Sequence, residues 1–388
     1  MGERIVQLLK NNKLFELENL PLDEEISKED RNRFFAVVST DLTPEQEKQI
    51  TDVETVYPRQ RSVLAVHWHP EFVPMELIRK RIETTFPNKT SDLIIPTQHN
   101  MLTEYDEYAG VEVDCYSHGF QRKVQLLIHF EKEHVVEAHT FKNILAHTFK
   151  YRSSQLFSFI HAIVKPDERI INTAAEETGA TADIVRFVTH YVVKIENLLE
   201  RHYDEILPMS IKNKLLRNYF DTLRSEVNET VINRAQTFLQ AVKNLIKKEF
   251  SLKFFYRTSE IIEEARSLGA GIVIPHPEQF WPVLLADYDV DGYEVWNPQS
   301  LEYTRFLINT MVRQNRQQHL SRPLIIFMGD DTHMGEKTRP IAEQNKKKAA
   351  REIGVQPPWD DMDIRKLLIK AGMDRNQVIS EYRARLAG

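Results

Sequence analysis

The stretch Arg61–Phe72, RSVLAVHWHPEF, decides the fold and contains the first candidate functional residues. An apolar run with strand character ends in His67 and His69, and Glu71 follows two residues later. Side chains alternate between the two faces of an extended segment, so we expect these three to point the same way. Imidazoles that converge at the end of a buried strand are typical of a metal site. A short His-x-His also occurs on solvated strand ends, so a metal site requires further ligands from elsewhere in the chain.

The composition excludes several classes of protein. A chain of 388 residues is long enough for one large α/β domain with additions, or for two domains. Its formal net charge of −6 argues against a generally basic nucleic-acid binder, although a local basic face stays open. Cys115 is the only cysteine, which excludes an intrachain disulfide and favours a reducing compartment. The N-terminus lacks the apolar core of a signal peptide and no run approaches a membrane span, so we expect a cytoplasmic protein without membrane contact.

Apolar strands and amphipathic helices alternate on the C-terminal side of the opening stretch. We expect strands at Ser62–Val66, Leu93–Pro96, Val111–Val113, Val124–Ile128, Ile272–Ile274, Gly292–Asn297 and Leu324–Met328. Such alternation predicts a parallel α/β sheet or barrel, in which functional groups gather at the carboxyl ends of the strands. Histidines follow several of these strands: His67, His69, His99, His129, His276 and His333. Neutral imidazoles mixed with carboxylates suit divalent ions such as Zn, Mn or Fe.

The chain divides into five predicted segments. They are an N-terminal extension (1–60), a first α/β block (61–150), a helical insertion (151–257), a second α/β block (258–335) and a C-terminal helical tail (336–388). The extension is predicted to contain a helix near Arg4–Leu17, a strand-like stretch at Phe34–Ser39 and a helix that starts at Thr43.

The helical insertion is predicted from apolar residues that recur at helical spacing. Its stretch Ser210–Arg257 carries ten Lys and Arg against four Asp and Glu. A solvated helix face is the simpler interpretation of this charge, and a basic face for a phosphate-bearing partner is the alternative. Whether the insertion serves as a lid or as a surface for a homo-oligomer stays open.

Seven short motifs in order complete the sequence pattern. They are His-x-His, IPTQHN (95–100), GVEV (110–113), IHF (128–130), IPHP (274–277), GYEVWN (292–297) and GDDTH (329–333). This order resembles the polymerase and histidinol phosphatase (PHP) family of metal-dependent phosphoesterases, over about 61–135 and 270–335. The resemblance implies a distorted (β/α)7 barrel, with up to three metal ions in a cleft at the carboxyl ends of the strands.

The resemblance also implies a set of metal ligands. Matched motif by motif, they are His67, His69, His99, Glu112, His129, His276, Asp331 and His333. Glu112 would bridge two ions, and His99 and His333 match the ligands of a third. Many family members carry a further Asp or His about five residues after the His-x-His, where this chain has Phe72-Val73-Pro74. Glu71 is the nearby substitute, so it decides between two and three ions. The fourth motif is shifted as well, because the chain has Gln125-Leu126-Leu127-Ile128-His129 where many members have His-Leu-Leu-Gly.

The function implied by the resemblance is that of a metal-dependent hydrolase, most simply a phosphoesterase that uses a metal-bound hydroxide at a di- or trinuclear site. If the third ion is absent, His99 or His333 would protonate the leaving group. The acidic net charge favours a small phosphate ester or a nucleotide as substrate, and nucleic-acid ends stay open. Two alternatives remain: a PHP-like binding or regulatory protein without activity, and an amidohydrolase-type enzyme that cleaves a C–N bond. The amidohydrolases usually use a bridging lysine, and no lysine stands at a predicted strand end.

Overall fold

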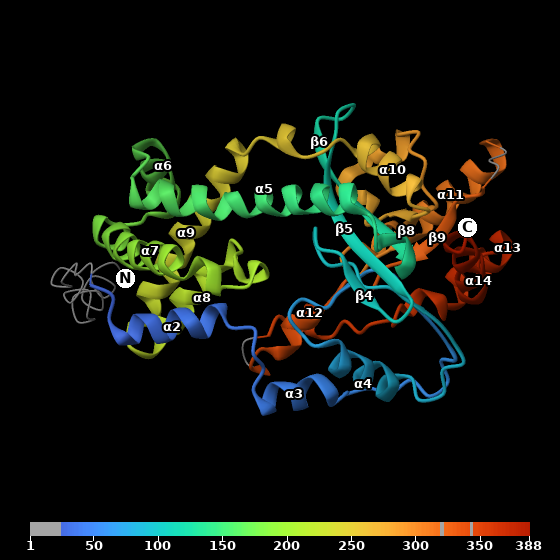
Figure 1. Cartoon of the computed structure of the whole chain (residues 1–388), viewed down its shortest axis with the longest axis horizontal. Helices are drawn as coiled ribbons and strands as arrows, with labels where there is room; N and C mark the ends of the chain where they lie inside the picture. Colours follow the sequence, from blue (N-terminus) through green and yellow to red (C-terminus); the bar gives the residue numbers. More distant parts are fainter. Residues whose placement is uncertain (1–24, 319–321, 342–343) are drawn as a thin grey trace, which may run out of the picture. The chain divides into compact units, whose positions relative to one another are not determined.

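The computed structural model describes residues 25–318, 322–341 and 344–388, so the helix predicted near Arg4–Leu17 lies outside the described residues (Figure 1). The chain separates into two compact units. One comprises Tyr151–Ser251 with the described part of Met1–Asp41, and the other comprises Leu42–Lys150 with Leu252–Gly388. The boundary near residue 150 falls inside the long helix α5 (His139–Val164). The second unit includes the stretches 42–60 and 336–388, which are predicted to be a separate extension and tail.

The first unit is helical. Besides the C-terminal part of α5 it contains α2 (Lys28–Val38), α6 (Glu168–Thr178), α7 (Ala182–His202), α8 (Lys214–Thr222) and α9 (Glu229–Glu249). The apolar residues that predict these helices, such as Ile184, Phe187 and Phe238, lie in one buried core. The strand expected at Phe34–Ser39 is wrong, because this stretch is the second half of α2. Ser27 caps that helix through a capping box with Asp30, and a helical turn brings both Phe34 and Val38 into the core.

A buried ion pair joins two helices of this unit. Asp30 of α2 accepts a hydrogen bond from Lys194 of α7 at 2.8 Å, and both side chains are at least nine-tenths buried. Tyr219 of α8 donates a longer bond of 3.3 Å to the same carboxylate. Burial alone would raise the pKa of Asp30, but the bonds from Lys194 and Ser27 outweigh it and hold the pKa below the usual value of 3.8.

In its described residues, the second unit combines ten strands with helices. Its strands are β1 (Ser62–Ala65), β2 (Trp68–His69), β3 (Ser91–Ile94), β4 (Thr103–Tyr105), β5 (Tyr108–Ser117), β6 (Arg122–Glu131), β7 (Gly271–Ile274), β8 (Gly292–Trp296), β9 (Ile325–Met328) and β10 (Thr332–His333). Its helices are α3 (Pro44–Thr51), α4 (Met75–Thr85), the N-terminal part of α5, α10 (Thr258–Ser267), α11 (Thr304–Gln318), α12 (Lys346–Ala349), α13 (Met362–Ala371) and α14 (Arg375–Leu386). The α/β class predicted from the sequence is confirmed.

The described strands form three ladders, which do not close into a (β/α)7 barrel. Six strands pair in the order β4-β5-β6-β7-β8-β9, while β1 pairs with β3 and β10 pairs with β2. β7, β8 and β9 are parallel, as expected, but β4 to β7 pair antiparallel because β5 and β6 form a long hairpin (Figure 1). Isolated backbone contacts also connect the ladders, among them a bond from the Asp331 amide to the His67 carbonyl at 2.9 Å and an isolated bridge between His99 and Glu112.

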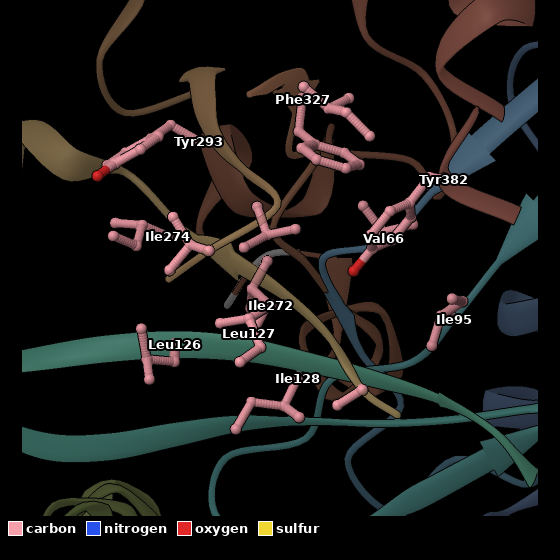
Figure 2. Close-up of a cluster of buried hydrophobic side chains, with 14 of the residues drawn as sticks. Val66, Ile95, Leu126, Leu127, Ile128, Ile272, Ile274, Tyr293, Phe327 and Tyr382 are labelled. Atoms are coloured by element: carbon pink, nitrogen blue, oxygen red, sulfur yellow. The ribbon is translucent and has the colours of Figure 1, made fainter. Parts of the chain in front are cut away.

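Aliphatic and aromatic side chains from β1, the β5–β6 hairpin and β7 to β9 fill the core of this unit (Figure 2). Tyr382 of the C-terminal helix α14 belongs to the same core. It lies so close to Gly271 of β7 that a Cβ at this position would overlap its phenol ring. The C-terminal helix therefore packs directly on the sheet. Across the described residues, no helix is both long and apolar enough to cross a membrane.

Candidate metal centre

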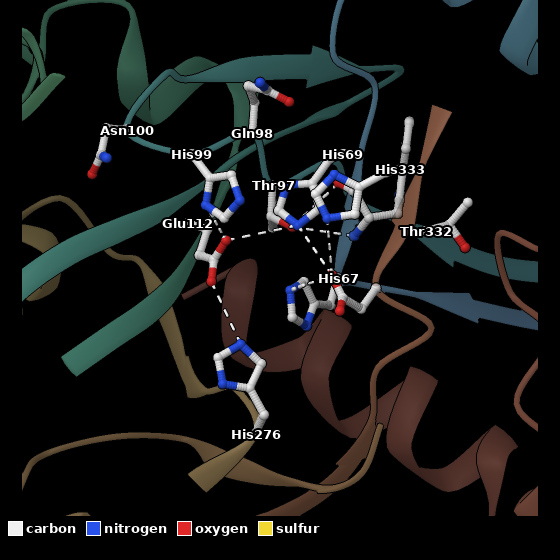
Figure 3. A network of polar contacts seen from close by, with 12 residues as sticks. His67, His69, Thr97, Gln98, His99, Asn100, Glu112, His276, Thr332 and His333 are labelled. Atoms are coloured by element: carbon white, nitrogen blue, oxygen red, sulfur yellow. Dashed lines mark hydrogen bonds and ion pairs between the residues drawn. The ribbon is translucent and has the colours of Figure 1, made fainter. Parts of the chain in front are cut away.

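Two short strands bring the His-x-His and Asp-x-His motifs together. β2 and β10 pair in parallel, with His69 opposite His333 and Trp68 opposite Thr332. Side chains alternate along each strand, so the histidines of both strands share one side (Figure 3). Trp68 faces the other way into the apolar core. Its backbone amide donates a 3.2 Å hydrogen bond to the hydroxyl of Thr97, the residue two positions before His99. The sequence predicts that these histidines converge at strand ends, and the register in which β2 pairs with β10 brings His69 and His333 together.

The imidazoles lie close to one another around the Asp331 carboxylate. His69 stacks between His99 and His333, with ring centroids 4.4 and 4.3 Å away. Asp331 Oδ1 lies 3.4 Å from His333 Nε2, 3.5 Å from His69 Nε2 and 3.8 Å from His67 Nε2. Three ring nitrogens thus face a single carboxylate oxygen at distances mostly too long for good hydrogen bonds.

Glu112 of β5 faces two sets of imidazoles with its two oxygens. Oε2 lies 2.5 Å from His99 Nδ1 and 3.7 Å from His69 Nε2, whereas Oε1 lies 3.7 Å from His276 Nε2 (Figure 3). The side chain is 1% exposed. A buried carboxylate placed in this way has the geometry to bridge two cations, with one oxygen directed at each.

Seven of the nine predicted ligands form three overlapping groups. The groups are His69, His99 and His333; His67, His69 and Asp331; and His67, Glu112 and His276. Within each group the potential ligand atoms lie within 4.8 Å of one another. Nδ1 of His69, Nε2 of His67 and Nδ1 of His276 are buried and make no hydrogen bond among the described residues. Such nitrogens are costly to bury without a partner, and divalent ions favour this donor set, so the residues fit metal ions.

The two remaining predicted ligands lie elsewhere. Glu71 borders the groups, with Oε1 3.6 Å from His333 Nδ1. His129 lies outside all three groups: Nδ1 pairs with the Tyr382 hydroxyl at 2.7 Å and Nε2 with the Val66 carbonyl at 2.9 Å. Burial lowers the pKa of His129 to about 3, so the ring is neutral, with one nitrogen donating and the other accepting. His129 lies on the face of β6 that is covered by α14. Its side chain therefore points into the core and not toward the three groups.

The backbone around the groups is strained. Four of the six non-glycine residues with positive φ in the described chain are Glu71 (53°), Asn100 (53°), His276 (29°) and Asp331 (47°). Such conformations cost about 1–3 kcal/mol each and persist only where the surrounding contacts enforce them. The side-chain amide of Asn100, for example, donates a hydrogen bond to Asp114 Oδ2 at 2.8 Å. Strained residues of this kind are often concentrated at functional sites, which is consistent with a candidate site in this region.

Three side chains outside the groups orient the candidate ligands. Glu294 of β8 accepts from His67 Nδ1 at 2.6 Å and from the His276 amide at 3.0 Å, so Nε2 of His67 is turned toward Asp331. Gly329 leaves room for Glu294, because a Cβ there would overlap the carboxylate. Arg351 donates to Asp331 Oδ2 at 2.7 Å, and Gln299 donates to the same oxygen at 2.6 Å. Glu294 belongs to the GYEVWN motif of the sequence pattern, but no motif contains Arg351 or Gln299, which reach the site through long-range contacts.

Buried charges separate the pKa values of the histidines. Burial alone would lower the pKa of His67, but the carboxylates of Glu294, Asp331 and Glu112 raise it to about 10. Burial and the neighbouring imidazoles lower the pKa of His69 to about 3. Burial opposes ionisation of Glu112 and Asp331, yet the surrounding histidines hold the pKa of both well below the usual range. The site thus contains ionised carboxylates among the imidazoles, and such carboxylates can interact with a bound cation.

Asp330, next to Asp331, has a separate role. It accepts from the Gly354 amide at 3.0 Å and the Gln356 side chain at 3.3 Å, away from the imidazoles. Burial raises its pKa to about 7. Asp330 therefore anchors the segment that follows α12. Its side chain points away from the imidazoles, whereas the side chain of Asp331 points toward them.

The fold and site define a mixed α/β protein with a buried histidine–carboxylate cluster. Among solved structures, the chain is similar to a protein from Bifidobacterium adolescentis that is assigned as a metal-dependent phosphoesterase. The two are 16% identical with a TM-score of 0.39, over 81% of this chain and 97% of the other. No protein-family model and no curated protein matches the chain.

Proposed function

We propose that the protein is a metal-dependent hydrolase of the PHP type that acts as a phosphoesterase. The observation that carries the proposal is the set of three overlapping groups, in which His67 and His69 each belong to two. The order of the ligand motifs along the chain, from His-x-His to Asp-x-His, supports the PHP assignment.

Two or three divalent ions, of Mn, Zn or Fe, would be held by the seven grouped residues, with Glu112 as the bridge. Bound ions of this kind supply Lewis acids that lower the pKa of a water and offset charge on phosphoryl oxygens. Glu71 is the residue that would extend the group of His69, His99 and His333, because its carboxylate lies beside His333.

Within this proposal, the chain's own residues orient the ligands and move the proton. Glu294 holds His67, and Arg351 with Gln299 holds Asp331, so that both present a fixed atom to the cluster. His99 and His333 are the partly exposed histidines of the cluster, at 31% and 21% for their side chains. They therefore border the side from which a substrate enters, and where the third ion is absent either would donate a ring proton to the leaving oxygen.

A small phosphate ester or nucleotide is the proposed substrate class, in keeping with the net charge of −6. The amidohydrolase alternative gains no support from the cluster. Among the described residues, the buried lysines are Lys194 of the helical unit and Lys337. Lys337 donates to the carbonyls of Ala349 and Arg351 and to Glu352, and none of these belongs to the three groups.

Metal analysis of the purified protein tests the site. We expect at least one equivalent of Mn, Fe or Zn in the full chain and a clear loss in His67→Ala. His139→Ala is the matched control, because this histidine belongs to none of the three groups and its side chain is 76% exposed. Metal content below one equivalent that is equal in all three proteins would refute the metal centre.

A panel of phosphomonoesters, phosphodiesters and nucleotides with added Mn tests the activity. Turnover should disappear in Asp331→Ala and persist in His139→Ala. If the protein binds metal but turns over none of these substrates, the inactive binding or regulatory alternative is favoured instead.

A further inference from the structure

A cavity lies in the α/β unit at the end of β1 opposite the candidate metal centre. It has a volume of about 590 Å³ and is lined by residues 56–62, which lead into β1, and by parts of the C-terminal segment that include α13 and the start of α14. Ser62 begins β1 at this cavity, whereas His67 follows the carboxyl end of the same strand. Five residues of strand separate the two by roughly 17 Å. The cavity is therefore distinct from the candidate metal centre.

Arginines dominate the charge around this cavity. Four line it, Arg59, Arg61, Arg365 and Arg375, against two acids, Asp360 and Asp374. Both acids are already engaged: Asp360 pairs with Arg375 at 3.2 Å, and Asp374 caps α14 by accepting from two backbone amides. Within the described parts of the chain, the other three arginines are exposed and have no acidic partner. The cavity thus has an excess of positive charge.

Arg375 brings part of this charge into the wall of the cavity. Its side chain is 13% exposed, and its Nε atom is buried without a hydrogen-bond partner in the described chain. The guanidinium lies 6.0 Å from the ring of Trp359, another lining residue. Burial lowers the pKa of Arg375, and the positive charge of Arg365 lowers it further. Two cations that repel each other beside one cavity are stabilised by an anion placed between them.

Apolar side chains complete the lining. Trp359 and Leu368 are buried, while Val56 and Ile369 are exposed by 45% and 57%. A volume of this size lies within the usual range for small-molecule sites, roughly 300–1,000 Å³. A ligand that has both an anionic and an apolar part matches both features.

We propose that this cavity binds a small organic phosphate, with the phosphate against Arg59, Arg365 and Arg375 and the organic part against the exposed apolar side chains. Arginine suits this role because its planar fork pairs with two phosphate oxygens at once. The site does not depend on metal ions or on the hydrolytic activity.

Calorimetric titration of the full chain in EDTA tests the proposal, since turnover is then prevented. The probes are adenosine 5′-monophosphate, inorganic phosphate and adenosine. We expect adenosine monophosphate to bind, adenosine not to bind, and the affinity for the phosphate probes to fall by about tenfold or more in Arg365→Ala and in Arg59→Ala. Both arginines are exposed, so these substitutions leave the core unchanged.

Two control variants locate the binding. Lys366→Ala removes an exposed positive charge from the same helix without changing the lining, and His67→Ala disrupts the candidate metal centre. Both should bind the phosphate probes like the unmodified chain. Affinity that is lost in His67→Ala but retained in Arg365→Ala overturns the proposal, as do equal losses in Lys366→Ala and Arg365→Ala. Absence of phosphate binding to the unmodified chain also overturns it.

Discussion

Replacing Arg351 with methionine should loosen the candidate metal centre, although Arg351 is not a ligand. Its Nη1 atom donates to the Asp331 side chain at 2.7 Å and to the Asp331 carbonyl at 2.8 Å. Both side chains are 7% exposed, so the pair is buried. Methionine keeps most of the length and apolar volume of the side chain but removes both bonds, which isolates their contribution.

The expected loss has two parts. Removing one member of a buried ion pair costs about 3–5 kcal/mol of unfolding free energy, and Asp331 retains Gln299, so we expect about 3 kcal/mol. Partners that orient a metal ligand are typically worth about 10–100-fold in metal affinity. Asp331 also adopts a strained backbone conformation, with φ at 47°, which the bond to its carbonyl helps to hold. We therefore expect weaker metal binding together with lower stability.

Urea unfolding of EDTA-treated protein measures the first part, and competition with a chelator measures the second. Arg305→Met is the matched control, because Arg305 pairs with Asp363 at 3.0 Å on the surface, with side chains more than 60% exposed. A surface pair of this kind contributes about 0–1 kcal/mol. If Arg351→Met is no more harmful than Arg305→Met in either assay, the reasoning about Asp331 is wrong.

Three further predictions concern other parts of the chain. Asp30→Asn should lower the unfolding free energy at neutral pH by about 3 kcal/mol, because Lys194 is left buried and unpaired. Since the folded pKa of Asp30 lies below 3.8, its contribution is present above that pH and disappears as the pH falls further, so urea titrations should show the gap between variant and parent closing in acid. Gly329→Ala should displace Glu294 and reduce metal content, measured by elemental analysis; unchanged content would contradict the close contact. His129→Leu should retain the metal content of the parent while thermal unfolding shows a loss of about 1–3 kcal/mol, whereas loss of metal would identify His129 as a ligand after all.

Local patterns in the sequence suffice for much of the candidate site. His67 and His69 share one side because strand alternation has a period of two, and the same rule applies to Asp331 and His333. Apolar runs before these motifs predict the buried strands β1 and β9, and helical spacing predicts α7 and α9. These features depend on residues close together in the chain, so they can be inferred without knowledge of the fold.

Pairings between distant segments were decided by the tertiary structure. The hairpin of β5 and β6 is local, but β6 pairs antiparallel with β7, which lies about 140 residues further along the chain, so three of the five pairings in the main sheet are antiparallel. The same hairpin turns His129 toward Tyr382, a residue from the far C-terminus. Arg351 reaches Asp331 through the segment that follows α12, and no local pattern marks it.

The stretch Arg61–Phe72 shows both the effect of local sequence and the effect of tertiary structure. Its sequence alone determines a buried strand that ends in two histidines on one side, because that requires only strand alternation and an apolar run. What those histidines face was decided by tertiary structure: the parallel register of β2 with β10 places His333 beside His69, and β8 supplies Glu294 to His67. The physical reason is that backbone pairing and burial act between segments more than 200 residues apart, where sequence periodicity carries no information.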